Sequence, residues 1–110
     1  MSATSSFTLA DLEARVKTRA QASADVSYTR KLLDRGVAHC AKKLGEEAAE
    51  TVIAAVAEER GKLIAETADL LYHLMVVLAA RDVALAEVEA ELQSRMAQSG
   101  LQEKASRKPD

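Results

Sequence analysis

The sequence has few of the residues that interrupt helices or build aromatic cores. It contains one proline, four glycines and no tryptophan in 110 residues, and aromatic residues make up only 3%. Hydrophobic residues nevertheless reach 48%, so a core must be made mainly of Leu, Val, Ile and Ala, which suits packed helices better than a β-sandwich. The composition therefore predicts an all-α fold in a chain long enough for one domain.

Other absences limit the environment and the partners. Cys40 is the single cysteine, so it has no partner for an intrachain disulfide, which favours a reducing cytoplasm. No uninterrupted apolar run reaches about 18 residues, and residues 1–7 lack the basic and apolar regions of a signal peptide. The net charge of −2 shows no basic excess of the kind that binds nucleic acid. We therefore expect a cytoplasmic protein with neither a nucleic-acid partner nor a membrane partner.

Caps and breaks divide the chain into four or five helices. Thr8 and Asp11 resemble an N-terminal capping box, and Gly36 either bends or begins the next long helix. Arg60-Gly61 is the strong break in the middle and predicts a helical hairpin. The expected helices cover 8–22, a long stretch from between 31 and 37 to about 59, 62–80 and 84–97, with 23–29 as a connection and a turn at 81–82. We expect residues 1–97 to form the single domain and residues 98–110 to form a polar, flexible tail.

The helix predicted at 62–80 is apolar on nearly all sides. A helix with this pattern must be buried, and three short neighbours can hardly enclose it. We therefore expect the chain to form a homodimer that pools two helical hairpins into one bundle.

Acidic residues gather on one side of the long helix that precedes the break. Glu46, Glu47 and Glu50 are three or four residues apart, so their side chains are neighbours on the helix surface. A solvated, charged face explains this pattern as readily as a site does, because like charges at these spacings cost only about 0.2–0.5 kcal/mol per pair. The motif alone is therefore weak.

The next helix is largely apolar but carries a narrow polar stripe, in which His73 follows the two acidic residues Glu66 and Asp69. Carboxylates against apolar surface cost several kcal/mol per ion unless a positive charge meets them, and no Lys or Arg lies between Lys62 and Arg81. In an antiparallel hairpin about Arg60-Gly61, residues 47–50 come beside residues 69–73, so the levels of the two stripes match only in part. A hard divalent cation would resolve the repulsion between the facing carboxylates.

The residue types favour magnesium, with manganese as its substitute. Magnesium prefers carboxylates, waters and phosphate oxygens. A di-iron bundle would need Glu-x-x-His pairs, which are absent, and zinc would need more His or Cys than this region offers.

At this point the chain resembles a known family. The pattern Glu46-Glu47-x-x-Glu50, fifteen residues, then Glu66-x-x-Asp69 is similar to the signature of the MazG-like all-α nucleotide pyrophosphohydrolases. Within that superfamily, residues 27–29 (Ser-Tyr-Thr), 43–55 and 66–74 resemble the phosphoribosyl-ATP pyrophosphatases, and the resemblance spans roughly 9–95. It implies hydrolysis of phosphoribosyl-ATP to phosphoribosyl-AMP and pyrophosphate, the second step of histidine biosynthesis, with a magnesium cofactor and a dimer.

The resemblance also implies roles for individual residues. The metal ligands would be Glu47, Glu50, Glu66 and Asp69. Glu46 would be a further ligand or the base that orients water, which makes Glu46, Glu47 and Glu50 the catalytic candidates.

A basic segment before the acidic motif supplies candidates for the nucleotide substrate. Lys43 is the first candidate for the polyphosphate and Arg30 the second, with Lys42 beside them. Lys43 could instead form a salt bridge with Glu47 at i,i+4. Tyr28 either stacks on a base or packs the loop, and Cys40 packs a helix. His73 is expected to pack in the core or behind the metal ligands rather than to act as a catalyst, and its spacing from Asp69 allows a hydrogen bond that orients that carboxylate.

Two other functions remain open on sequence alone. One is a housecleaning pyrophosphatase that uses the same acidic site on other nucleoside triphosphates. The other is a non-enzymatic helical dimerisation module whose acidic residues form only a charged face.

Overall fold

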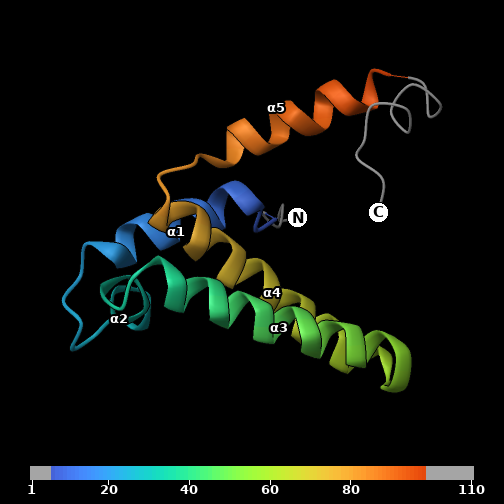
Figure 1. The fold of residues 1–110 in the computed structure, drawn as a ribbon, viewed down its shortest axis with the longest axis horizontal. Helices are drawn as coiled ribbons and strands as arrows, with labels where there is room; N and C mark the ends of the chain where they lie inside the picture. The colour runs from blue at the N-terminus through green and yellow to red at the C-terminus, as the bar shows by residue number, and fades with distance from the viewer. Residues whose placement is uncertain (1–5, 99–110) are drawn as a thin grey trace.

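Five α-helices make up the described part of the chain, residues 6–98 of a computed structural model (Figure 1). They are α1 (Leu9–Ala20), α2 (Tyr28–Asp34), α3 (Val37–Ala57), α4 (Arg60–Ala80) and α5 (Leu85–Met96). Residues 6–98 contain no strand, which confirms the predicted all-α class. The predicted tail, apart from residue 98, lies outside the described residues.

The predicted start of α1 is confirmed. The side chain of Thr8 accepts a hydrogen bond from the backbone N–H of Asp11 at 3.1 Å, and the Asp11 carboxylate accepts one from the N–H of Thr8 at 2.9 Å. This reciprocal pair satisfies two N–H groups that a helix start leaves free. The helix ends at Ala20, two residues earlier than predicted.

Helix α2 was missed, because its first residues fall within the predicted connection. Ser27 caps it: the hydroxyl accepts a hydrogen bond from the N–H of Arg30 at 3.1 Å and donates one to the carbonyl of Arg19 at 2.8 Å. The buried Ser27 therefore begins α2 and ties it to the end of α1. Gly36 then separates α2 from α3 with a φ of +95°, a conformation in which a side chain would be strained.

Helices α3 and α4 form the predicted antiparallel hairpin and lie side by side (Figure 1). The turn was predicted at Arg60-Gly61, and that position is wrong. The chain reverses at Glu58 and Glu59, which are extended, and Gly61 already lies in the first turn of α4. The reversal comes two residues earlier than predicted, so the register of the two helices differs from the predicted one. The acidic residues of α3 therefore lie level with Glu66 and Asp69 of α4.

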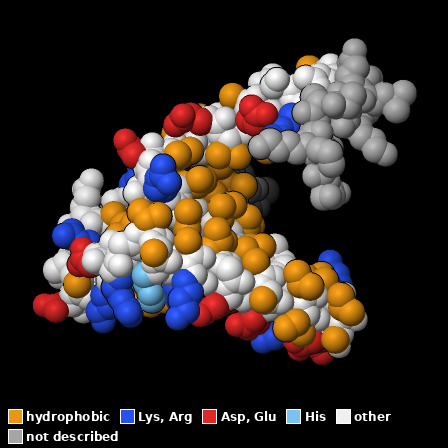
Figure 2. All heavy atoms as spheres, viewed as in Figure 1, with side chains coloured by type: hydrophobic (Ala, Val, Ile, Leu, Met, Phe, Trp, Pro, Cys, Tyr) orange, Lys and Arg blue, Asp and Glu red, His pale blue; other side chains and the backbone are white. Residues whose placement is uncertain are grey.

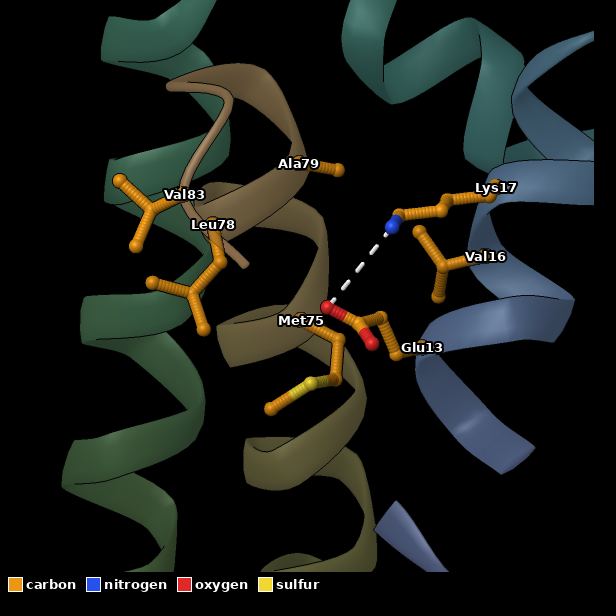
Figure 3. Close-up of a pocket in the computed structure, with 7 residues that line it drawn as sticks. All are labelled: Glu13, Val16, Lys17, Met75, Leu78, Ala79 and Val83. Carbon is orange, nitrogen blue, oxygen red and sulfur yellow. Dashed lines mark ion pairs between the residues drawn. The ribbon is translucent and has the colours of Figure 1, made fainter. Parts of the chain in front are cut away.

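The core lies where α1 and α2 meet the second half of α4. Its buried members are Val16, Leu32, Cys40, Met75, Val76 and Leu85. Figure 3 shows the contact between α1 and α4, with Glu13 and Lys17 beside apolar side chains that include Met75 and Leu78. Cys40 donates a hydrogen bond to the carbonyl of Leu32 at 3.2 Å, in agreement with its predicted role in helix packing.

Helix α5 projects away from the hairpin (Figure 1). The turn predicted at 81–82 is confirmed, and Asp82 adopts a left-handed φ of 56° there. Within α5 only Leu85 is buried, while the large apolar side chains of Leu92 and Met96 are exposed.

Candidate metal centre

Three carboxylates from two helices come together at the middle of the hairpin. Glu47 of α3 meets Glu66 and Asp69 of α4, and one possible ligand oxygen from each lies within 4.8 Å of the other two. Oxygens bound to Mg²⁺ at 2.0–2.1 Å lie within about 4.2 Å of one another, and those bound to a larger divalent cation at 2.3–2.6 Å lie within about 5 Å. The three side chains therefore fit a single divalent cation, and their donors are all the hard oxygens that Mg²⁺ or Mn²⁺ prefers.

The electrostatics of this group favour a positive ligand. Partial burial, and then the neighbouring charges of Glu50, Asp69 and Glu66, raise the pKa of the Glu47 carboxyl. Burial and each of the neighbouring negative charges disfavour the charged form of Glu47. Without a cation, the ionised form of Glu47 is therefore unfavourable in this group.

Lys62 meets one of these carboxylates, although no lysine or arginine lies between Lys62 and Arg81 in the sequence. Glu66 is only 5% exposed, and Nζ of Lys62 lies 2.9 Å from its carboxylate. The two residues are one helical turn apart, and the hydrogen bond raises the pKa of Lys62. One ammonium against three carboxylates still leaves the group net negative.

The remaining acidic candidates, Glu50 and Glu46, lie around this group. Glu50 is exposed on α3 and close enough to raise the pKa of Glu47. Glu46 forms an ion pair with Lys43 at 3.2 Å, and this hydrogen bond lowers the pKa of Glu46. The predicted alternative partner of Lys43 was Glu47, so the structure replaces that pair with Lys43–Glu46.

The basic candidates lie on α2 and the first half of α3. Lys43 is partly buried and Lys42 is exposed, and Figure 2 shows blue basic side chains along the corresponding edge of the molecule. Arg30 is already used within the fold, since it pairs with Asp34 at 2.8 Å and donates to the carbonyl of Ala20 at 3.1 Å. Within residues 6–98, Lys43 has one ion-pair partner, the exposed Glu46, whereas Arg30 has two partners within the fold, so Lys43 is better placed to meet a phosphate.

Three aromatic rings pack together at the start of α2. Tyr28 is 53% exposed and lies edge-on to His73, with ring centroids 6.5 Å apart, while Tyr72 lies edge-on to His73 at 5.0 Å. The hydroxyl of Tyr72 hydrogen-bonds that of the buried Thr29. In the Ser-Tyr-Thr segment the two outer residues are thus structural, and Tyr28 is free to contact a ligand.

His73 does not orient Asp69 through Nδ1. It is 7% exposed, and within residues 6–98 its Nδ1 has no hydrogen-bond partner. Burial, followed by the charge of Lys43, lowers the pKa of His73, which favours the neutral ring at pH 7.

Sequence reasoning missed Thr51, one turn after Glu47. Its hydroxyl lies 2.8 Å from the carbonyl oxygen of Glu47 and 3.2 Å from that of Glu66. One sequence signal could have identified this residue: a polar threonine lies on the face of α3 that packs against α4.

Comparison with known proteins agrees with this arrangement. The sequence model of the family described as phosphoribosyl-ATP pyrophosphohydrolase matches residues 9–96. The chain is 61% identical to phosphoribosyl-ATP pyrophosphatase 1 of Rhodopseudomonas palustris, over 94% of this chain and 97% of the relative. It is 62% identical to phosphoribosyl-ATP pyrophosphatase 1 of Bradyrhizobium diazoefficiens (93% and 96%) and 59% identical to phosphoribosyl-ATP pyrophosphatase of Nitrobacter winogradskyi (94% and 90%).

Proposed function

Because the chain belongs to the phosphoribosyl-ATP pyrophosphohydrolase family, we propose that Glu47, Glu66 and Asp69 bind the divalent cation used in its reaction. The chain is a hydrolase that converts phosphoribosyl-ATP to phosphoribosyl-AMP and pyrophosphate, the second step of histidine biosynthesis. Neither the housecleaning pyrophosphatase nor the non-enzymatic module is favoured by these matches. We place the reaction in the cytoplasm.

The observation that carries the metal proposal is the convergence of three carboxylates within 4.8 Å. Glu50 is the fourth ligand candidate, because it stands beside Glu47 at the exposed side of the group. The all-oxygen donor set favours Mg²⁺, with Mn²⁺ as its substitute. When bound, Mg²⁺ would neutralise charge on the leaving pyrophosphate and lower the pKa of a coordinated water.

The protein's own groups divide the remaining work. Glu46 is the candidate for orienting the attacking water, because its carboxylate lies outside the three-carboxylate group and is held by Lys43. Lys43 would also bind the polyphosphate, with Lys42 beside it. Tyr28 offers an exposed ring for the base. Arg30 is the weakest substrate candidate, since Asp34 and the Ala20 carbonyl already bind it.

Binding of Mn²⁺ without substrate tests the metal proposal. We expect the unmodified protein to bind Mn²⁺, as followed by the electron paramagnetic resonance signal of the free ion, and Glu66→Gln and Asp69→Asn to lose that binding. Glu89→Gln removes an exposed carboxylate of α5 and serves as the control, which should bind normally. Normal Mn²⁺ binding by Glu66→Gln would remove this residue from the site.

We also propose that two copies of the chain pack together through the apolar face of the hairpin. By length and composition alone, α4 could cross a membrane. Only 22% of an apolar 18-residue stretch of this helix is buried within the chain, so most of the stretch needs another partner to cover it. The acidic side chains of Glu66 and Asp69 and the packing of α4 against α3 support a place inside a helical bundle instead.

The surface gives this proposal a location. Val52, Ile53, Val56 and Ile64 are all more than half exposed on the hairpin, as are Leu92 and Met96 on α5. Figure 2 shows apolar side chains lining the hollow between α5 and the hairpin, and a second group of them at the free end of the hairpin. A patch of this kind commonly marks an interface between proteins.

Light scattering after size-exclusion chromatography tests the dimer. We expect a dimer for the unmodified chain and a monomer for Val56→Glu, because Val56 is 83% exposed and a charge there would be desolvated on association. Lys31→Glu, at an exposed position of α2, should remain dimeric. A monomeric unmodified chain would contradict the proposal.

A further inference from the structure

The hydroxyl of Thr51 joins the two helices that carry the metal-binding carboxylates. It lies 2.8 Å from the carbonyl oxygen of Glu47, one turn earlier on α3, and 3.2 Å from that of Glu66 on α4. A hydroxyl has one proton to donate, so the two carbonyls share it. The first bond is the usual one for threonine within a helix, whereas the second crosses to the neighbouring helix.

Both carbonyls belong to residues whose side chains are in the three-carboxylate group. The hydroxyl therefore couples the backbone of Glu47 to that of Glu66. Within residues 6–98, no other side chain of α3 makes a hydrogen bond or ion pair with α4. Relative movement of the two ligand residues is thus opposed by one polar contact.

The helices are also close together at this level. Ala54 lies three residues after Thr51, on the same face of α3, and is 0% exposed. A small side chain at such a contact lets two helices approach closely, but it packs without directional preference. Apolar packing brings the helices near each other but does not by itself fix their relative level.

We propose that Thr51 is a positioning residue, whose hydroxyl holds Glu47 level with Glu66 so that one divalent cation can reach Glu47, Glu66 and Asp69 together. This inference rests on the metal site proposed above. The possible ligand oxygens lie within 4.8 Å of one another, and a slip of one helical turn, about 5.4 Å, would carry the α3 ligand beyond that range. Even a fraction of that slip would take one carboxylate out of reach.

Thr67 of α4 provides a matched comparison. It is half-buried like Thr51, and its hydroxyl donates to the carbonyl of Leu63, four residues earlier, at 2.7 Å. Among the described residues it makes no hydrogen bond to α3. Thr51 and Thr67 therefore share the bond within the helix and differ in the bond between the helices.

The test compares Thr51→Val, Thr51→Ser and Thr67→Val in the full-length protein. Mn²⁺ affinity is measured without substrate, from the electron paramagnetic resonance signal of the free ion. We expect Thr51→Val to bind Mn²⁺ about tenfold more weakly, since losing a group that orients metal ligands costs 10–100-fold. Thr51→Ser keeps the hydroxyl and should bind normally, and so should Thr67→Val.

Turnover separates positioning from general damage. In Thr51→Val, saturating metal should restore kcat, so that the change appears in the metal concentration needed for half activity. Equal weakening by Thr51→Val and Thr67→Val, or normal binding by Thr51→Val, would overturn the inference.

Two further outcomes are also decisive. If Thr51→Val does not fold, Thr51→Ala and Thr51→Ser give the same comparison at one position, and equal affinity in these two variants would overturn the inference. If the unmodified protein binds no Mn²⁺, the metal site itself is wrong and the role of Thr51 fails with it.

Discussion

The carboxylate of Glu13 on α1 accepts a hydrogen bond from the backbone N–H of Leu85 at the start of α5, at 2.7 Å. Ala84 precedes α5 and has no side chain that can cap it. Glu87 accepts the N–H of Ala84 at 2.9 Å, so two glutamates satisfy the first N–H groups of this helix. The first helix thus supplies a cap to the last, and Figure 3 shows Glu13 at the contact between α1 and α4.

Removing this cap should destabilise the protein. We expect Glu13→Ala to lower the free energy of unfolding by about 1 kcal/mol, the usual effect of losing a helix cap, as measured by urea denaturation. Ala84→Asp should recover part of that loss in the Glu13→Ala background and gain less in the unmodified chain. Lys17→Ala is the control: its ion pair with Glu13 is 3.9 Å long and partly exposed, so its loss should cost less than about 0.5 kcal/mol. Equal losses for Glu13→Ala and Lys17→Ala would contradict the capping role.

The carboxylates of the metal site should destabilise the metal-free protein. Burial and three neighbouring carboxylates raise the pKa of Glu47 above its ordinary value of 4.5, so the folded state holds a proton that the unfolded state has lost. Stability without metal therefore falls as the pH rises from about 4.5 through the raised pKa.

Glu47→Gln tests this repulsion. Without metal at pH 7, we expect the variant to be more stable than the unmodified protein by roughly 0.5 kcal/mol, and the difference should vanish below pH 4.5. Saturating Mn²⁺ should reverse the order, because it stabilises only the protein that binds it. Thermal denaturation with and without Mn²⁺ measures both effects, and a less stable metal-free variant at pH 7 would disprove the repulsion.

The buried ring of His73 should make the fold sensitive to acid. Burial lowers the pKa of His73 below 6.5, so the unfolded state takes up a proton before the folded state does. The stability that depends on neutral His73 is present above pH 6.5 and is lost as the pH falls below it. We expect His73→Leu to lose less stability than the unmodified chain between pH 7 and pH 5. His39→Leu, at a more exposed histidine, should change that pH dependence less.

Loss of a proposed metal ligand should abolish turnover while the fold persists. We expect Glu50→Ala and Asp69→Ala to lower kcat at least about 100-fold. Losing a residue that only orients a metal ligand already lowers metal affinity or activity about 10–100-fold. Circular dichroism should show an unchanged helix content, and Glu89→Ala should keep normal activity. Normal activity of either ligand variant would remove that residue from the site.

Local patterns predicted the parts of the fold that depend on near neighbours. The Thr8–Asp11 cap and the acidic stripe of α4 follow from spacings of three and four residues. Helix α2 was missed because seven residues show little periodicity, although Ser27 at its N-cap was a usable signal.

Details that depend on contacts between helices could not be obtained from the sequence. Gly61 suggested the turn, yet the chain reverses at Glu58 and Glu59, which fixes the levels of α3 and α4. That shift of two residues brings Glu66, as well as Asp69, to the level of Glu47. The contact of Thr51 with α4 and the cap that Glu13 provides to α5 depend on the same tertiary arrangement.

Pyrophosphate release by the purified protein tests the central claim most directly. Phosphoribosyl-ATP would be compared with ATP and dUTP, each with Mg²⁺ and with excess chelator. We expect turnover of phosphoribosyl-ATP alone, dependent on Mg²⁺ and lost with chelator, because the carboxylates of Glu47, Glu66 and Asp69 fit a divalent cation. Turnover of phosphoribosyl-ATP that persists in excess chelator would contradict the metal site, and turnover of ATP or dUTP instead would contradict the substrate.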